Sequence, residues 1–176
     1  MSRKSPAFLA LGLNLIKLSP ALSIGTSPVT RAQYRAITGK DPAYSLADLN
    51  APVERVSWIN AQGAAMALNN AEFAPPGYEY RLPTLAERRA LALAIFPGKI
   101  PLGSVHSLSP QHPAGFVGLR GLLWEWTADR DGKTAIAAGS SFLDWHLFAD
   151  AAHPEISLPT DTRWHTLGFR LALAKK

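Results

Sequence analysis

Apolar side chains recur at three- and four-residue intervals in three stretches of the chain, and the first of these covers residues 29–39. Tyr34 and Ile37 lie on this rhythm, which is the spacing of one face of a helix. Thr30 precedes them and can cap the first exposed amides, and Gly39 is the usual residue after a last helical turn. The pattern predicts a short helix within residues 29–39.

A second helix is predicted after Ser57, which is a good N-cap residue. Its apolar positions repeat at helical spacing as far as Asn69 and Asn70, and they are Trp58, Ala61, Ala64, Ala65 and Leu68. Because most of these side chains are small, we expect this helix to pack closely against its neighbours.

A third helix is predicted from the spacing of Thr84 and Glu87. In such a capping box, each side chain accepts a hydrogen bond from the backbone N–H of the other residue. Pro83 fixes the approach to the helix, which we expect to continue to about Ala94. Four prolines within residues 96–116 exclude a long regular element there, so we expect an ordered loop region.

Strand-like patterns occupy both ends of the chain. At the beginning, apolar residues predict a buried strand pair, and they are Phe8, Leu9, Leu11, Leu13, Leu15 and Leu18. In the second half, strands are expected at Leu119 to Thr127, Ala135 to Ala138 and Gly168 to Ala174. This order lacks the regular alternation of a parallel α/β sheet and predicts an α+β fold. A length of 176 residues with 47% apolar content fits one domain over residues 1–176.

The beginning of the chain has an alternative interpretation. Arg3 and Lys4 precede an apolar run over residues 7–16, which is the pattern of a short signal peptide. We expect this segment to enter the fold instead, because Asn14 interrupts the run and Lys17 follows it. No segment has the roughly 20 apolar residues of a membrane span, so none is expected to cross a membrane.

The absence of cysteine excludes several kinds of chemistry. Without a thiol the chain has no disulfides, thiolate metal ligands, cysteine nucleophiles or redox switches. The formal net charge is +5, but the basic residues are scattered singly or in pairs and form no basic stripe. The sequence also contains no phosphate-binding loop, nucleophile elbow or zinc-protease motif.

Five short motifs occur in order over nearly the whole chain. They are Pro28-Val29-Thr30 with Gln33-Tyr34, Pro52-Val53 with Val56-Ser57-Trp58, Tyr80-Arg81-Leu82-Pro83-Thr84 with Glu87, Trp124-Glu125-Trp126-Thr127 with Asp129, and Gly168-Phe169-Arg170-Leu171. In order and approximate spacing they resemble the formylglycine-generating-enzyme-like family, also called the sulfatase-modifying-factor domain. The resemblance covers residues 23–171 and implies a C-type-lectin-related α+β fold with short helices, small antiparallel sheets and long ordered loops.

Most of these motif residues have a structural interpretation. The charged residues lie inside apolar strings, where burial requires an ion pair and hydrogen bonds, so we expect mutual pairing among Arg81, Glu87, Glu125 and Arg170. The bulky aromatic residues are expected to fill the core, and they are Trp58, Trp124 and Trp126.

The chain departs from the family where the family's chemistry resides. Enzymes of the family that oxidise a substrate cysteine bind copper through two cysteines, which this chain lacks. Relatives that use non-haem iron need a histidine-rich site from an additional helical domain, for which the chain has no room. The family's Gly-Asn-Val is here Gly121-Leu122-Leu123, which removes an oxygen ligand of a calcium site, and Arg88 replaces a common tryptophan. The resemblance therefore implies a non-catalytic binding module without catalytic residues, metal or cofactor.

The segment 141–165 differs in composition from the rest of the chain. It contains four carboxylates against one arginine, and it is rich in aromatic residues and histidine. Such mixtures are typical of protein-recognition surfaces, and in the resembling fold this segment forms the lectin-like ligand face. We expect it to bind a protein or cell-surface ligand. The candidate ligand-binding residues are Ser141, Asp144, Trp145, His146, Phe148, Asp150, Asp161, Arg163, Trp164 and His165.

Two binding functions remain open at this point. In relatives diversified by retroelements, the variable region lies just before the terminal Gly-Phe-Arg, and the segment 141–165 has this place. On this first interpretation, the chain is a diversity-generating-retroelement variable protein. The alternative is a fixed assembly subunit of an oligomer, a larger complex or a virion. In either case the aromatic side chains must reach a partner, whereas an ordinary loop would bury them.

A metal-dependent, oxygenase-like enzyme is the weakest alternative. His146, His153 and His165 have aspartates nearby and could in principle hold a metal. Their spacing fits no helix or hairpin ligand pattern, so loop histidines facing solvent are the simpler interpretation. Nucleic acid is not an expected partner, because the acidic segment 141–165 would repel phosphates.

Overall fold

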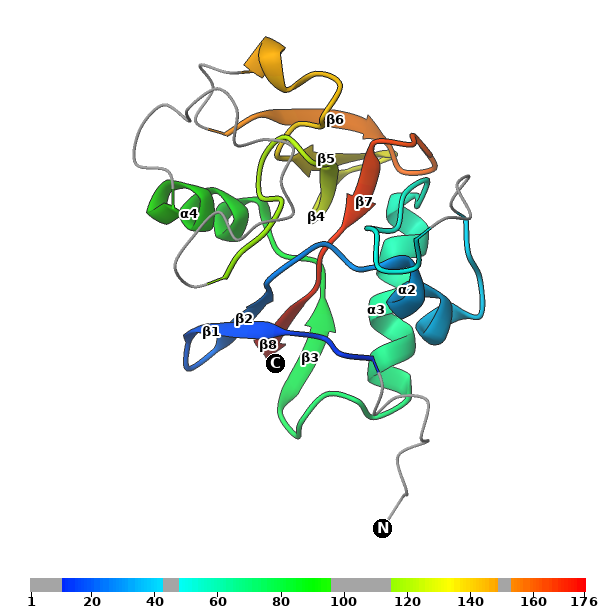
Figure 1. Cartoon of the computed structure of the whole chain (residues 1–176). Helices are drawn as coiled ribbons and strands as arrows, with labels where there is room; N and C mark the ends of the chain where they lie inside the picture. Colours follow the sequence, from blue (N-terminus) through cyan, green and yellow to red (C-terminus); the bar gives the residue numbers. More distant parts are fainter. Residues whose placement is uncertain (1–10, 43–47, 96–114, 149–152) are drawn as a thin grey trace.

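The computed structural model describes residues 11–42, 48–95, 115–148 and 153–176. Within them, two four-stranded sheets and three helices form the α+β fold that the sequence predicts (Figure 1). The two sheets lie toward opposite ends of the molecule, and the helices flank them. The loop region expected over residues 96–116 falls almost entirely outside the described residues.

The first sheet joins strands from distant parts of the chain. In spatial order they are β1 (Leu15–Ser19), β2 (Leu22–Gly25), β8 (Ala172–Lys175) and β3 (Tyr78–Arg81), all antiparallel to their neighbours. The predicted strand pair is only partly correct. Leu15 and Leu18 lie on β1, but the partner strand β2 follows the predicted residues, and Leu11 and Leu13 lie outside any strand. Phe8 and Leu9 lie outside the described residues. Leu18, expected to be buried, is 43% exposed because it lies near the open end of an edge strand.

The second sheet carries the motifs of the second half of the chain. In spatial order its strands are β6 (Glu155–Pro159), β5 (Thr134–Ala138), β4 (Trp124–Asp131) and β7 (Leu167–Phe169). β4 and β7 run parallel, and the other pairs are antiparallel. The strand expected from Leu119 begins only at Trp124, because the chain turns first through Gly121 at a φ of 73°.

The three helices form where their caps predict them. They are α2 (Arg31–Thr38), α3 (Trp58–Asn70) and α4 (Leu85–Ile95). Thr30 makes a capping box at the start of α2, Gly39 ends that helix in the left-handed conformation, and Ser57 caps α3. At α4 the predicted box is present, because Thr84 N donates to Glu87 at 2.7 Å and Glu87 N donates to Thr84 at 3.2 Å. None of the described helices is long and apolar enough to cross a membrane.

Two of the three motif tryptophans lie in the core. Trp124 and Trp126 are each 1% exposed, and the indole N–H of Trp126 donates to Val56 O at 2.8 Å. Trp58 is only partly buried, and it packs at the margin of the core with its indole N–H on Thr127 O. The core interpretation is confirmed for the two tryptophans of β4 and is only partly correct for Trp58.

The expected pairing of the motif charges is confirmed. Arg170 and Glu125 are both fully buried and form a bidentate pair at 2.7 and 2.8 Å. Arg81 and Glu87 form a second bidentate pair, with side chains that are 26% and 20% exposed. Arg88 approaches the same Glu125 carboxylate at 3.5 Å, which the sequence did not predict.

Candidate functional site

The two ends of the candidate segment 141–165 are attached to the same backbone, the residues that lead into β4. On one side, Phe142 N donates to Leu122 O at 3.3 Å, next to a bridge between Leu122 and Ser141. On the other side, Trp124 N donates to Thr166 O at 2.8 Å. Residues near position 142 and near position 165 therefore flank one buried stretch of chain.

Asp144 organises the first of these loops. Its Oδ2 accepts the indole N–H of Trp124 at 2.7 Å, and its Oδ1 accepts both the backbone N–H and the hydroxyl of Ser141 at 2.7 Å. Ser141 itself is 1% exposed, and Asp144 is half-buried. Ser141 therefore lies beneath the surface rather than on it, and these two candidate residues support the loop instead of presenting free polar groups.

Large apolar side chains are exposed on this loop, which we call the recognition loop (residues 142–148). Phe142 is 40% exposed, Leu143 is 54% exposed and Leu147 is 72% exposed. Residues 145–148 form a short 3-10 helix, η1 (Trp145–Phe148), which projects at the end of the molecule that carries β6 (Figure 1). Burial of such side chains in a partner would be favourable, whereas their exposure to water is not.

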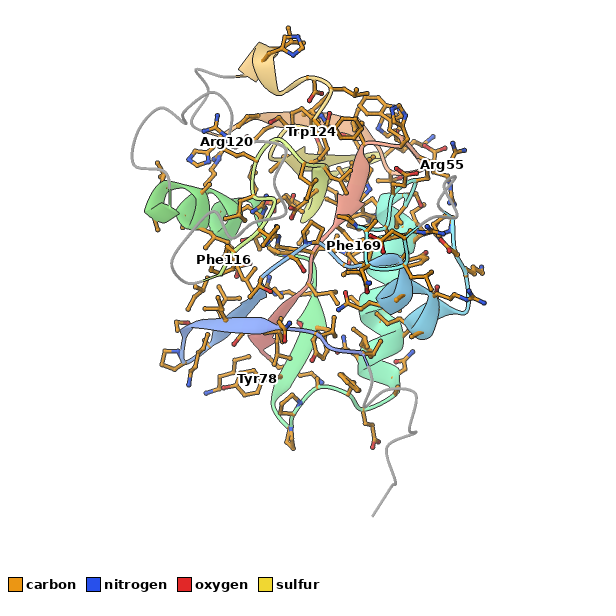
Figure 2. The ribbon with its side chains drawn as sticks, viewed as in Figure 1. Arg55, Tyr78, Phe116, Arg120, Trp124 and Phe169 are labelled. Atoms are coloured by element: carbon orange, nitrogen blue, oxygen red, sulfur yellow. The ribbon has the colours of Figure 1, made fainter. Side chains whose placement is uncertain are left out.

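Trp164 presents a further aromatic side chain, on the turn between β6 and β7. It is 41% exposed, which confirms the expected exposure of this residue. Its carbonyl accepts hydrogen bonds from Arg55 N at 3.0 Å and from Leu167 N at 3.1 Å, so the backbone at this position is held in place. Figure 1 shows this turn and η1 toward the same end of the molecule, and Figure 2 labels the neighbouring Arg55 there.

The remaining candidates divide into exposed and undescribed residues. The exposed polar candidates are His146, Asp161, Arg163 and His165. The side chains of Trp145 and Phe148, and all of Asp150, lie outside what the structure describes. No three histidine, aspartate or glutamate side chains of the described residues are grouped as a metal site would need, so the metal alternative gains no support from them.

Leu143 and Leu147 are the surface residues that sequence reasoning missed. These aliphatic residues were not among the candidates from the sequence, because hydrophobicity alone does not distinguish an inward from an outward side chain. A signal was nevertheless present in the sequence. Ser141 and Asp144 are a polar pair three residues apart, and their mutual hydrogen bonds form a tight loop that leaves the intervening side chains outside.

Solved structures of other proteins share this arrangement of helices and sheets. Variable protein 1 of Treponema denticola superposes with a TM-score of 0.67 at 18% identity, over 88% of this chain and 84% of that chain. CarF superposes with a TM-score of 0.68 at 18% identity, over 94% of this chain and 100% of that chain. PvdO from Pseudomonas aeruginosa superposes with a TM-score of 0.68 at 17% identity, over 87% of this chain and 80% of that chain. No protein-family model and no curated protein sequence matches the chain. The likeness is one of fold, and it confirms the formylglycine-generating-enzyme-like, C-type-lectin-related fold that the sequence motifs predicted.

Proposed function

We propose that the chain is a non-catalytic binding module whose ligand face is formed by the recognition loop and the β6–β7 turn. The observation that carries the proposal is the exposure of four large apolar side chains on these segments: Phe142, Leu143, Leu147 and Trp164. Surface apolar groups on loops held by a rigid scaffold are typical of binding sites. The exposed polar residues His146, Asp161, Arg163 and His165 form the rim of this face.

The expected ligand is a protein or a cell-surface molecule with its own apolar patch. A few aromatic anchors supply most of the binding energy at such interfaces, and the surrounding polar groups govern orientation and association rate. Trp164 is the main anchor in this proposal, because its backbone is fixed by two hydrogen bonds before any ligand binds. An anchor that is already positioned loses less conformational entropy on binding.

The experiment uses peptides selected on the purified protein from a random displayed library. Replacing Trp164 with alanine should weaken their binding by about 2 kcal/mol or more, the range of an interface hot spot. Leu18→Ala is the matched control, because Leu18 is 43% exposed but lies on β1 in the other sheet. The proposed face would be contradicted if Trp164→Ala and Leu18→Ala weakened binding equally, or if neither variant weakened it.

Two specific roles are compatible with this face. The position of the segment 141–165 directly before β7, together with the likeness to a protein named as a variable protein, favours diversification by a retroelement. A reverse-transcriptase gene beside the coding sequence, with a near-repeat of the part that encodes this segment, would support that role. Invariant sequence across many isolates would instead favour a fixed assembly subunit.

Absence of catalysis is part of the proposal. The chain has no cysteine, so the thiol-based copper chemistry of the resembling enzymes has no ligands here. Metal analysis of the protein after incubation with iron, copper or calcium tests the remaining possibility. Retention of a redox metal in stoichiometric amount would overturn the non-catalytic role.

A further inference from the structure

A small cavity lies between α4 and the beginning of β6, apart from the recognition loop. Charged and polar side chains line it together with a few apolar groups, and the former are Arg88, Arg89, Arg120, His153 and Glu155. Figure 2 labels Arg120 near the start of β6. The cavity offers about 10 Å³ to the centre of a water-sized sphere, which is room for one atom of that size.

Arg88 is the most unusual residue in this cavity. It is 3% exposed, and only its Nη2 has partners, donating to Leu119 O at 3.1 Å and lying 3.5 Å from Glu125 Oε2. Its Nε and Nη1 are buried and meet no hydrogen-bond acceptor among the described residues. These two atoms carry three N–H hydrogens, and leaving buried donors of a charged group unpaired is costly.

The charges around Arg88 do not balance. Glu125 is its nearest carboxylate, but Arg170 already holds both Glu125 oxygens at 2.7 and 2.8 Å. Arg89 and Glu155 neutralise each other through a separate bidentate pair at 2.6 and 2.7 Å. Two buried guanidinium groups therefore share one carboxylate, and a buried charge is stable only when it is compensated.

The pKa of Arg88 is lowered mainly by burial and further by the neighbouring Arg170. Burial lowers it from 12.5 to about 10, with Glu125 acting against the shift and Arg170 adding to it. The group is still protonated at neutral pH, so the positive charge remains. His153 also lines the cavity, and its buried Nε2 meets no hydrogen-bond partner among the described residues. Burial lowers the pKa of His153, and the three neighbouring arginines lower it further, against Glu155.

We propose that this cavity binds a single halide-sized anion, which in solution is chloride, held by the Nε and Nη1 side of Arg88 with His153 beside it. An anion accepts several N–H groups and supplies the missing negative charge. The charged lining holds three arginines against one carboxylate, that of Glu155, and Arg89 already binds both oxygens of this carboxylate, which favours an anion over a water molecule.

Gly139 keeps the space beside Arg88 open. At its φ of 112° a side chain is strained, and an added Cβ would lie 2.9 Å from Leu119 O and 3.3 Å from Arg88 Nη2. The glycine therefore allows the guanidinium to reach the Leu119 carbonyl.

The test is thermal unfolding of the purified protein in sodium chloride against sodium gluconate at constant ionic strength, since gluconate is too large for the cavity. A saturable rise in Tm of about 3–5 °C is expected at tenfold excess of chloride over its Kd. Arg88→Met should abolish the difference between the salts, because it leaves a neutral Arg170–Glu125 pair. Arg31→Met, which removes a buried arginine already paired with Asp41, should retain it.

Direct detection keeps the proposal falsifiable should Arg88→Met fail to fold. Crystals of the unaltered protein soaked in sodium bromide should show one anomalous peak within hydrogen-bonding distance of Arg88 Nε or Nη1. A Tm that is the same in both salts, or bromide found only on the surface, would overturn the site. An ordered water in the cavity with no response to halide would have the same consequence.

Discussion

At the scale of single residues, tryptophan serves two different purposes in this chain. Trp124 and Trp126 alternate with Glu125 on β4, and all three side chains are buried because the strand lies between β5 and β7. Trp164 lies on a turn and remains 41% exposed. The same residue type therefore stabilises the fold at two positions and is available for recognition at the third.

Replacing Trp126 with alanine should destabilise the protein severely. The change empties a large core site and leaves Val56 O without the indole donor, so we expect a loss of about 3–5 kcal/mol in the free energy of unfolding. Urea unfolding of this variant beside Trp164→Ala measures the contrast. Wild-type stability in Trp126→Ala would refute its core role.

Asp144 should act on the order of the recognition loop and not on the ligand directly. Asp144→Ala removes the carboxylate that accepts the indole N–H of Trp124 and both donors of Ser141, so we expect a loss of about 1–3 kcal/mol. Hydrogen exchange of residues 141–147 should also become faster. Asp161→Ala is the control, because Asp161 is exposed, and a similar effect from both changes would argue against the supporting role.

At the scale of elements, the start of α4 couples a helix end to an ion pair. Glu87 accepts from Thr84 N as a capping residue and also binds both terminal nitrogens of Arg81. Partial burial would raise the pKa of Glu87, but the hydrogen bonds from Arg81 and Thr84 outweigh it and hold the pKa below 4.5. The ionised form therefore stabilises β3 and α4 together.

The lowered pKa of Glu87 predicts a loss of stability in acid. The contribution of this carboxylate is complete above its unfolded pKa of 4.5 and disappears as the pH falls through the lower folded value. Glu87→Gln should thus be less stable than wild type at pH 7, and the difference should shrink as the pH falls below 4.5. Unfolding at several pH values measures it, and a pH-independent difference would exclude this origin.

The elements that the sequence predicted are those whose ends are determined locally. Thr30, Ser57 and Thr84 each precede their helix, and the structure confirms all three caps. β3 and β6 escaped prediction because they are short and lack a clear local pattern. Contacts with distant parts of the chain stabilise them, including their pairing with β8 and β5. The parallel contact of β4 with β7 joins residues about forty positions apart, which no local pattern encodes.

In the candidate segment, the exposure of Trp164 was predictable from the sequence, whereas the contacts of Ser141 and Asp144 were not. Composition identified the segment 141–165, and Trp164 is exposed as expected. Its neighbours Ser141 and Asp144 support the loop, because their polar groups bond to each other and to Trp124. The excess charge at Arg88 depends on which carboxylates lie nearby in space, and a sequence does not state that.

At the scale of the whole molecule, the core and the proposed ligand face occupy different parts. The main core cluster joins α2 and α3 to both sheets, whereas the exposed side chains of Phe142, Leu143 and Leu147 lie on a loop at one end. A binding surface whose sequence varies would require such a separation between variable side chains and the core. The scaffold can remain constant because its buried contacts do not include those side chains.

A triple change of Phe142, Leu143 and Leu147 to serine should therefore leave the fold intact. Substitutions at exposed positions usually alter stability by less than about 0.5 kcal/mol each, so we expect Tm to change by only a few degrees. Calorimetry and circular dichroism test this expectation, with Trp126→Ala as the destabilised reference. Unfolding of the triple variant would show that the loop is part of the core.

The position of β7 and β8 determines when the chain can fold during its synthesis. β8 lies between β2 and β3 in one sheet, and β7 completes the other sheet beside β4, so residues 167–175 close both sheets. A ribosome-bound chain that has not yet released these residues exposes the edges of β2, β3 and β4 to water. The long chain segments that separate the paired strands in sequence make the sheets slow to form, and unpaired strand edges promote aggregation. Folding should therefore wait for the release of residues 167–175, and nascent chains stalled before residue 167 should remain sensitive to protease.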